Sequence, residues 1–253
     1  MKIVPVPCSF DNYSYLIICT QSQEAAVVDP TEAYPVMAEI GRNNVRLTTV
    51  LCTHHHQDHI GDIGRLQEQI PSLKVVCHLS DKNRIGAANT HVDDRDNVEV
   101  GNLSGKILYT PGHTSGSICY HFQDHLFVGD TLFGAGCGRL FEGTPEQMYH
   151  SLRKIAALPS KTKIYFGHEY TRKNLEFAQL VEPGNKKVRD RLQQLSAGEA
   201  ISTPTTLELE RETNPFLRCD SKEIQSFFEH REKVAPGGAV EVFSLLRQLR
   251  NSF

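Results

Sequence analysis

The feature that most constrains the fold is a change of periodicity near residue 172 of a 253-residue chain. Before that point, short runs of β-branched residues alternate with stretches in which apolar residues recur every three to four positions. This alternation predicts strands interleaved with helices. After that point only helical spacing is found. The sequence therefore predicts two domains, residues 1–172 with strands and helices and a smaller helical domain at residues 173–253.

The predicted elements are short, and glycine or proline separates many of them. Strands are predicted at residues 2–6, 14–19, 25–28, 45–52, 73–77, 97–100, 106–109, 117–122, 125–128 and 163–166, and helices at 33–42, 60–70, 145–158, 175–180, 186–195, 223–228 and 240–249. Residues 196–206 are predicted to form a polar loop. Several strands follow one another as in hairpins, which favours two sheets packed face to face with helices outside. Periodicity alone does not separate this arrangement from a single doubly wound sheet.

Composition excludes several classes of protein. Hydrophobic residues make up 39% and the net charge is −3, as in ordinary soluble globular proteins. No long basic run is present, so nucleic acid is not an expected partner. No apolar stretch approaches the ~18 residues that span a bilayer, so we expect no membrane segment. Pro5, Pro7, Asp11 and Asn12 interrupt the apolar residues at the start of the chain, which does not resemble a presequence, so we expect a cytoplasmic protein.

The cysteines do not form a recognisable framework. There are seven, an odd number, and no two are spaced as C-x-x-C. This pattern fits neither a set of disulfides nor a thiolate zinc site, so we expect reduced thiols.

Residues 53–59, with the sequence THHHQDH, form the densest group of metal-binding side chains and follow a predicted strand. In extended chain His54 and His56 project the same way, and Asp58 and His59 follow at the start of the next helix. One histidine on a turn, or an aspartate capping a helix, needs no metal. Four donors within six residues exceed what one metal usually takes from a single loop, so this segment predicts a metal site.

Three later donors also stand just after predicted strands, each behind a glycine. They are His113, Asp130 and His168. We expect His54, His56 and His113 to bind one ion, Asp58, His59 and His168 to bind a second, and Asp130 to bridge the two. Nitrogen and carboxylate donors suit Zn²⁺, Fe or Mn²⁺. We expect His55 and Gln57 to face away from the metals.

The order H-x-H-x-D-H, G-H-T, G-D-T and G-H-E resembles the metallo-β-lactamase superfamily. Within it, residues 136–144, 167–171 and 212–218 resemble the glyoxalase II family, the hydroxyacylglutathione hydrolases, and the likeness runs along the whole chain. The resemblance implies a four-layer αββα sandwich, an α+β fold with its metals at one edge of the sheets. It also implies that a smaller α-helical C-terminal domain follows.

The resemblance implies a metal-dependent thiolester hydrolase. Its expected substrate is an S-(2-hydroxyacyl)glutathione, specifically S-D-lactoylglutathione, and the products are glutathione and a 2-hydroxy acid, as in the second step of methylglyoxal removal. Two divalent ions, with zinc favoured over iron or manganese, would hold a hydroxide that attacks the thioester. Asp58 and Asp130 are the expected catalytic residues, as ligands beside that hydroxide. We expect a monomer whose partner is this small molecule.

The same family resemblance implies which residues bind glutathione, a peptide with two carboxylates. They are Arg139, Phe141, Tyr170, Arg247 and Arg250. Two positions depart from the family: Phe141 stands where tyrosine is frequent, and Arg250 where lysine is frequent. The alternative to substrate binding by Arg247 and Arg250 is that both lie on a solvent-exposed face of a helix.

Cys137 lies in the glycine-rich segment that carries Arg139. No base is assigned to it, so we interpret it as a packed small residue rather than a nucleophile.

Three rival functions stay open on the sequence alone. The strongest is a glutathione persulfide dioxygenase, which uses a single iron on a similar ligand frame. The roughly 80 residues after the predicted sandwich and the F-E-G-T segment at residues 141–144 favour the hydrolase. A nuclease of the superfamily is disfavoured by the charge balance. A non-catalytic metal-binding module would not need donors for two ions.

Overall fold

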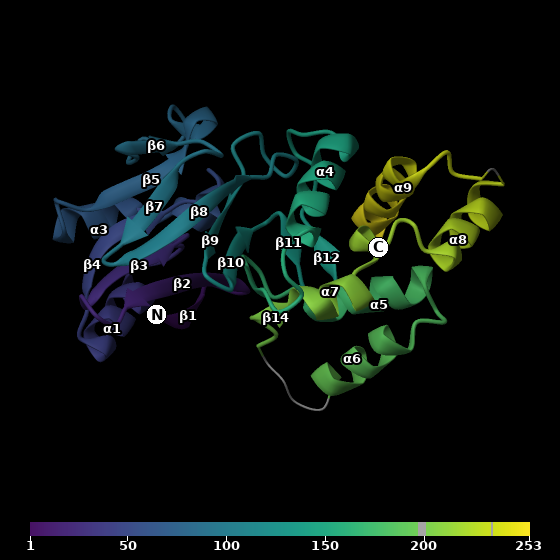
Figure 1. The fold of residues 1–253 in the computed structure, drawn as a ribbon, viewed down its shortest axis with the longest axis horizontal. Coiled ribbons are helices and arrows are strands. Elements are labelled where there is room, and N and C mark those ends of the chain that lie inside the picture. The colour runs from purple at the N-terminus through teal and green to yellow at the C-terminus, as the bar shows by residue number, and fades with distance from the viewer. Residues whose placement is uncertain (197–200, 234) are drawn as a thin grey trace. The chain divides into compact units, whose positions relative to one another are not determined.

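The computed structural model describes residues 1–196, 201–233 and 235–253 (Figure 1). The chain forms two compact units. The first comprises Met1–Tyr109 with Thr114–Gly129, and the second Thr110–His113 with Asp130–Phe253. The predicted domain boundary between residues 172 and 173 stays a prediction. No helix among the described residues combines the length and apolar character needed to cross a membrane.

A six-stranded mixed sheet forms the first layer of the first unit. Its strands lie in the order β1 (Lys2–Cys8), β2 (Asn12–Cys19), β3 (Glu24–Val28), β4 (Arg46–Leu51), β5 (Lys74–His78) and β6 (Thr90–Val92). The pairs β1–β2 and β2–β3 are antiparallel, whereas β3 through β6 run parallel. Parallel strands end at the same edge of a sheet, so the residues that follow β3, β4 and β5 meet there.

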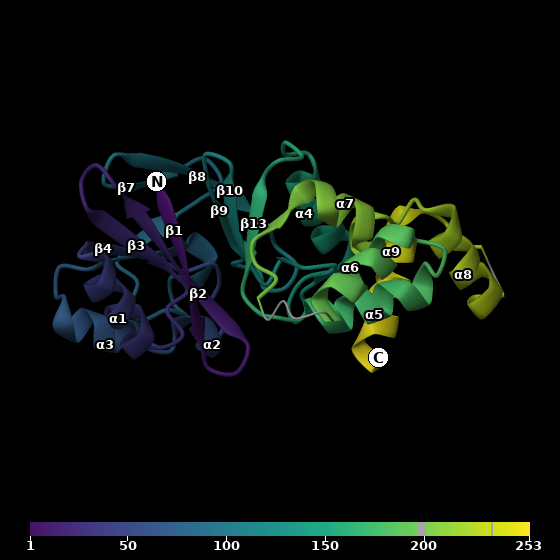
Figure 2. The ribbon, with the colours of Figure 1, turned by 90° about the horizontal axis from the view of Figure 1, so that it is seen from below.

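Helices α1 (Ala33–Asn43) and α3 (Ile63–Gln69) cover one face of this sheet (Figure 2). Alternate strand residues such as Leu16 and Val27 pack against Val36 of α1 and Leu66 of α3 in one buried cluster. The period of two along a strand explains why their neighbours point to the opposite face.

A second sheet covers that opposite face. In the first unit it contains β7 (Asn97–Val100), β8 (Leu103–Tyr109), β9 (Ile118–Phe122) and β10 (His125–Gly129), paired antiparallel in chain order. The rings of Tyr15 and Phe127 lie 5.7 Å apart between the sheets. The Tyr120 hydroxyl donates to the carbonyl of Cys52 at 2.8 Å. The first unit therefore has two sheets packed face to face, with helices on the outer face of the first sheet.

The second unit is mainly helical. It contains β11 (Leu132–Phe133), β12 (Gly136–Cys137), α4 (Pro145–Ala156), β13 (Lys163–Phe166), α5 (Thr171–Val181), α6 (Lys186–Ser196), β14 (Thr205–Thr206), α7 (Leu207–Thr213), α8 (Lys222–Glu232) and α9 (Ala239–Ser252). Helix α4 begins with a capping box between Thr144 and Gln147. The rings of Phe177, Phe216 and Phe243 pack in sequence at 6.1 and 5.7 Å.

The predicted α+β fold class, with a helical C-terminal region, is confirmed. Every predicted element is found, the strands at residues 97–100 and 163–166 with the predicted ends and the others with shifted ends. The expectation that no strand follows residue 172 is wrong, because Thr205–Thr206 pairs with β13 as β14. Helix α7 was also missed, since seven residues give too little periodicity. In place of the single helix expected over residues 60–70, the structure has two separate helices, α2 (Gln57–Ile60) and α3. Residues 197–200 of the predicted polar loop lie outside the described residues.

Candidate metal centre

The first donor cluster lies where β4 ends. The Nε2 atom of His54 is 3.1 Å from the Nδ1 atom of His56, and the two rings meet edge to face. A tetrahedral zinc ion with bonds of ~2.0–2.1 Å places two ligand nitrogens about 3.3 Å apart. The two imidazoles are therefore spaced to bind one ion.

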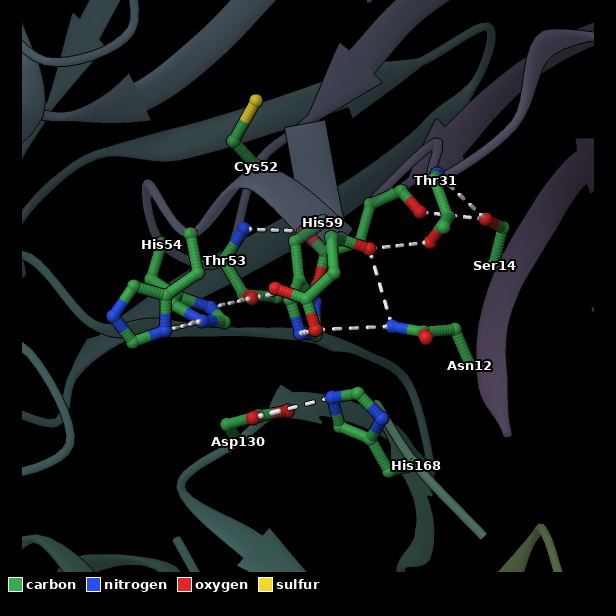
Figure 3. Close-up of polar contacts among 12 residues, drawn as sticks. Asn12, Ser14, Thr31, Cys52, Thr53, His54, His59, Asp130 and His168 are labelled. Carbon is green, nitrogen blue, oxygen red and sulfur yellow. Dashed lines mark hydrogen bonds and ion pairs between the residues drawn. The ribbon is translucent and has the colours of Figure 1, made fainter. Parts of the chain in front are cut away.

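Asp58 and His59 lie in the short helix α2, and the His59 side chain is drawn in Figure 3. The Nε2 atom of His59 is 3.7 Å from Oδ2 of Asp58, and His59 is buried while the Asp58 side chain is half exposed. Asn12 donates to both the carbonyl and the carboxylate of Asp58, at 3.1 and 3.3 Å. Thr31 donates its hydroxyl to the same carbonyl at 2.7 Å. These bonds fix Asp58 although much of its side chain faces solvent.

Asp29, which was not predicted from the sequence, contacts two of the residues in the segment 53–59. Its carboxylate accepts hydrogen bonds from the backbone and hydroxyl of Thr53 at 2.7 and 2.6 Å, and lies 3.0 Å from Nδ1 of His59. The Thr53 hydroxyl is also 3.0 Å from Nδ1 of His54. A carboxylate on Nδ1 directs Nε2 toward a metal and raises its basicity. Asp29 could have been found as an acid that directly follows β3, the parallel neighbour of β4.

Asp29, His54 and His59 present possible ligand atoms within 4.8 Å of one another. Because the Asp29 oxygens contact Thr53 and His59, we interpret Asp29 as a group that orients ligands rather than as a ligand.

His55 and Gln57, the residues between the expected ligands, take other positions. The Nδ1 atom of His55 is 3.1 Å from Oδ1 of the buried Asp81, which follows β5, and Gln57 is exposed.

The second donor cluster belongs to the second unit. Oδ2 of Asp130 lies 3.5 Å from Nε2 of His113 and 3.4 Å from Nε2 of His168, and all three residues are buried. Two ligands of one ion with bonds near 2.1 Å are separated by about 3.4 Å. One carboxylate oxygen therefore lies at ligand spacing from two histidines, as a bridging carboxylate requires.

The surroundings of this cluster orient both histidines. The Nδ1 atom of His113 donates to the carbonyl of Arg139 at 2.8 Å, so Nε2 is the nitrogen with a lone pair that could bind a metal. His168 stacks on Tyr170, with ring centroids 4.9 Å apart and planes 1° from parallel. Phe141 meets the edge of His113 at 5.3 Å and is 63% exposed. Phe141 and Tyr170 therefore lie against the donors.

Glycine is required at position 138. A Cβ atom there would lie 2.0 Å from the carbonyl oxygen of Asp130 and 2.9 Å from Nδ1 of His113. The backbone can approach both donors this closely only without a side chain.

Three arginines lie in or near the segment of residues 137–139. Arg139 is exposed, whereas Arg247 is 5% exposed and donates to the carbonyls of Cys137 and Gly138 at 2.7 and 3.4 Å. Arg250 is half-buried; burial and the nearby charges of Arg247 and Arg139 lower its pKa. Arg247 and Arg250 therefore do not lie on a solvent-exposed face of their helix. The grouped charges suit an anionic ligand.

Cys137 behaves as a packed residue. All seven cysteines are free and buried. Burial raises the pKa of Cys137 to about 11, against the lowering effect of Arg247, so this side chain is a neutral thiol near pH 7.

Comparisons with known proteins agree along the whole chain. Residues 10–168 match the family described as the metallo-beta-lactamase superfamily, and residues 169–253 match the hydroxyacylglutathione hydrolase C-terminus. A protein of Arabidopsis thaliana named cytoplasmic hydroxyacylglutathione hydrolase is 43% identical, over 99% of this chain and 97% of its own. A hydroxyacylglutathione hydrolase of Gloeobacter violaceus is 41% identical over 96% of each chain. The crystal structure of ETHE1 from Myxococcus xanthus superimposes with a TM-score of 0.70 at 28% identity, covering 98% of this chain and 91% of that one.

Proposed function

Because the chain belongs to the hydroxyacylglutathione hydrolases of the metallo-β-lactamase superfamily, we propose that it is a metal-dependent thiolester hydrolase. Its substrate is an S-(2-hydroxyacyl)glutathione, specifically S-D-lactoylglutathione, and its products are glutathione and the hydroxy acid, as in methylglyoxal removal. The observation that carries this proposal is the position of Asp130. One of its oxygens lies 3.5 and 3.4 Å from the Nε2 atoms of His113 and His168.

We propose that these donors bind two divalent ions. We propose the grouping expected from the sequence: His54, His56 and His113 for one ion, Asp58, His59 and His168 for the other, and Asp130 for both. All donors are imidazole nitrogens or carboxylate oxygens, which zinc, iron and manganese accept, and zinc is favoured. When bound, such a pair lowers the pKa of a water molecule toward neutrality and polarises the thioester carbonyl.

The side chains of this chain position the reactants. Asp29 and the carbonyl of Arg139 fix the metal-binding nitrogens of His59 and His113. Asp58 and Asp130 bring negative charge that offsets the charge of the ions. The leaving thiolate has a parent pKa of ~8.5, so it departs without a strong general acid. Cys137, as a neutral thiol, takes no part.

The arginines supply the binding site for glutathione. The peptide carries two carboxylates, and guanidinium groups pair with carboxylates at short range. Arg139 is exposed and contacts the substrate directly. Arg250 lies close enough to Arg139 for the charge of Arg139 to lower its pKa. Phe141 and Tyr170, which lie against His113 and His168, belong to the same glutathione site. We further propose a monomer in the cytoplasm, the compartment for which the Arabidopsis relative is named.

The test combines metal analysis with a thioester assay. Purified protein is analysed for zinc, iron and manganese, and the loss of thioester absorbance is followed with S-D-lactoylglutathione. We expect two ions per chain and turnover that stops on chelation. The melting temperature should also fall, because ions that bind only the folded state stabilise it.

Variants make this test specific. His113→Ala should lose metal and activity, whereas His230→Ala, on the exposed face of α8, should lose neither. Full activity in metal-free protein would refute the proposal. Oxygen consumption with glutathione persulfide, without thioester loss, would establish the rival dioxygenase with a single iron.

A further inference from the structure

A buried loop connects the bridging donor Asp130 to Arg139. We call residues 133–138 the glycine loop. Its two short strands pair at Phe133 and Gly136, and Ala135 has a φ of 54°, in the left-handed region. Every residue of the loop is buried. A buried turn must find partners for its backbone polar groups, and this one finds them on side chains from later in the chain.

Asn214 makes the central contacts. It is completely buried, and its Nδ2 atom donates to the carbonyls of Gly136 at 2.9 Å and Phe133 at 3.3 Å, the two residues paired in the loop. Its Oδ1 atom accepts from the backbone of Phe216 at 3.1 Å. Asn214 belongs to residues 212–218, a segment that resembles the glyoxalase II family, and the proposed chemistry gives it no role.

Three further side chains hold the rest of the loop. Glu210 accepts from the backbone of Ala135 at 2.7 Å, Asn174 donates to the carbonyl of Gly134 at 3.0 Å, and Arg247 donates to that of Cys137 at 2.7 Å. Glu210 also accepts a hydrogen bond from Asn214 at 3.1 Å and forms an ion pair with the buried Arg191. Five consecutive loop residues are therefore bound by side chains from α5, α7, α9 and Asn214.

The loop sets the position of the group that orients His113. Gly138 packs directly against the backbone of Asp130, and the next carbonyl, that of Arg139, accepts the proton of His113 Nδ1 at 2.8 Å. The backbone of Phe141 also donates to the carbonyl of His113 at 3.2 Å. A shift of the loop would move the Arg139 carbonyl and release the imidazole.

We propose that Asn214 is a positioning residue for His113, acting through the glycine loop and the Arg139 carbonyl. This inference rests on the proposed metal site and adds a role for the helical region in preparing a ligand. Hydrogen bonds that orient a ligand change metal affinity by about 10–100-fold, and Asn214 acts one step further away. We expect an effect near the lower limit.

The test compares Asn214→Ala with Asn185→Ala. Asn185 also makes several hydrogen bonds in the second unit, to Glu182, the carbonyl of Glu212 and the first turn of α6, but none to the loop or the donors. Both variants should unfold at lower urea concentration. Only Asn214→Ala should lower the affinity of the protein for one zinc ion about tenfold, as measured by competition with a chelator. Only this variant should also alter the absorption spectrum of cobalt-substituted protein. Its kcat should fall with KM within twofold.

A second variant keeps the test decisive if Asn214→Ala does not fold. Glu210→Gln keeps the shape of the side chain and weakens the acceptor for Ala135, so it should lower the same zinc affinity about threefold. Equal zinc affinities in the Asn214 and Asn185 variants, or an unchanged cobalt spectrum, would overturn the proposal. If wild-type protein binds metal but does not hydrolyse the thioester, the proposed function fails while the zinc comparison still decides the role of Asn214.

Discussion

The Nδ1 atom of His59 lies 3.0 Å from Oδ2 of Asp29, and both side chains are buried. Thirty residues separate them in the chain, yet the parallel pairing of β3 and β4 brings the ends of both strands to one edge. The same carboxylate accepts two bonds from Thr53, whose hydroxyl contacts His54. One acid therefore orients two imidazoles at once.

Asp29→Asn should weaken metal binding without removing a ligand. An amide is a weaker acceptor than a carboxylate and presents a donor to one of its partners, so we expect the affinity for one zinc ion to fall about 10–100-fold. Competition with a chromophoric chelator measures this. Asp62→Asn, which alters a cap of α1 in the same unit, is the control and should keep wild-type affinity. Equal losses in the two variants would contradict the assignment.

Gly138→Ala should disrupt the second donor cluster. The new methyl group would lie 2.0 Å from a backbone oxygen, so the loop has to move, and we expect destabilisation by more than about 2 kcal/mol and loss of metal. Gly41→Ala in α1 is the control, because nothing lies within 4 Å of its added Cβ. It should stabilise the protein by roughly 0.5–1 kcal/mol. Urea unfolding and metal content check both; normal metal binding in Gly138→Ala would contradict the geometry.

Cys137→Ala should leave the reaction intact. Burial raises the pKa of this thiol to about 11, so almost no thiolate forms near pH 7, and a thiol is a poor nucleophile. We expect kcat within twofold of wild type and no labelling of Cys137 by iodoacetamide at pH 7.5. A loss of activity beyond tenfold, with metal content unchanged, would show that Cys137 is catalytic.

Glu182 should make stability depend on acid pH. Burial favours its neutral form, but hydrogen bonds from Arg218, Ser221 and Asn185 outweigh this and lower its pKa below the usual 4.5. A pKa lowered by folding stabilises the protein above 4.5, and the contribution is lost as the pH falls through the folded-state value. Glu182→Gln should therefore cost about 2–3 kcal/mol at pH 7 and progressively less below pH 4.5.

Urea unfolding at a series of pH values measures this difference. Glu229→Gln, an exposed position on α8, is the control and should change stability by less than about 0.5 kcal/mol. A cost for Glu182→Gln that stays constant as the pH falls would show that the charge of Glu182 is not responsible.

Arg139→Ala should weaken substrate binding more than catalysis. The exposed guanidinium is removed, but the backbone carbonyl that orients His113 is retained, so we expect KM to rise about tenfold while kcat stays within twofold. Steady-state kinetics with the thioester checks this. The exposed Arg153 of α4 provides the control variant Arg153→Ala, with unchanged KM. A fall in kcat alone would place Arg139 outside the binding site.

Much of the fold was predictable because burial repeats locally along the chain. A strand such as β9 or a helix such as α4 shows its period within a few residues, and the ends shift only slightly in the structure. Elements of two or seven residues, such as β14 and α7, are too short to show a period and form because neighbouring elements hold them. Element boundaries and short strands therefore needed the structure.

The chemical types of the donors are the part of this protein that the sequence alone determined. His54, His56, Asp58 and His59 stand together after one strand, and His113, Asp130 and His168 each stand after a strand and a glycine, so position and side-chain chemistry predict them as metal ligands. The partners of these donors followed only from tertiary structure. Asp29 and the Arg139 carbonyl, together with Asn214 behind the glycine loop, act through hydrogen bonds between distant segments. Such bonds depend on strand pairing and helix packing, which leave no local pattern in a sequence.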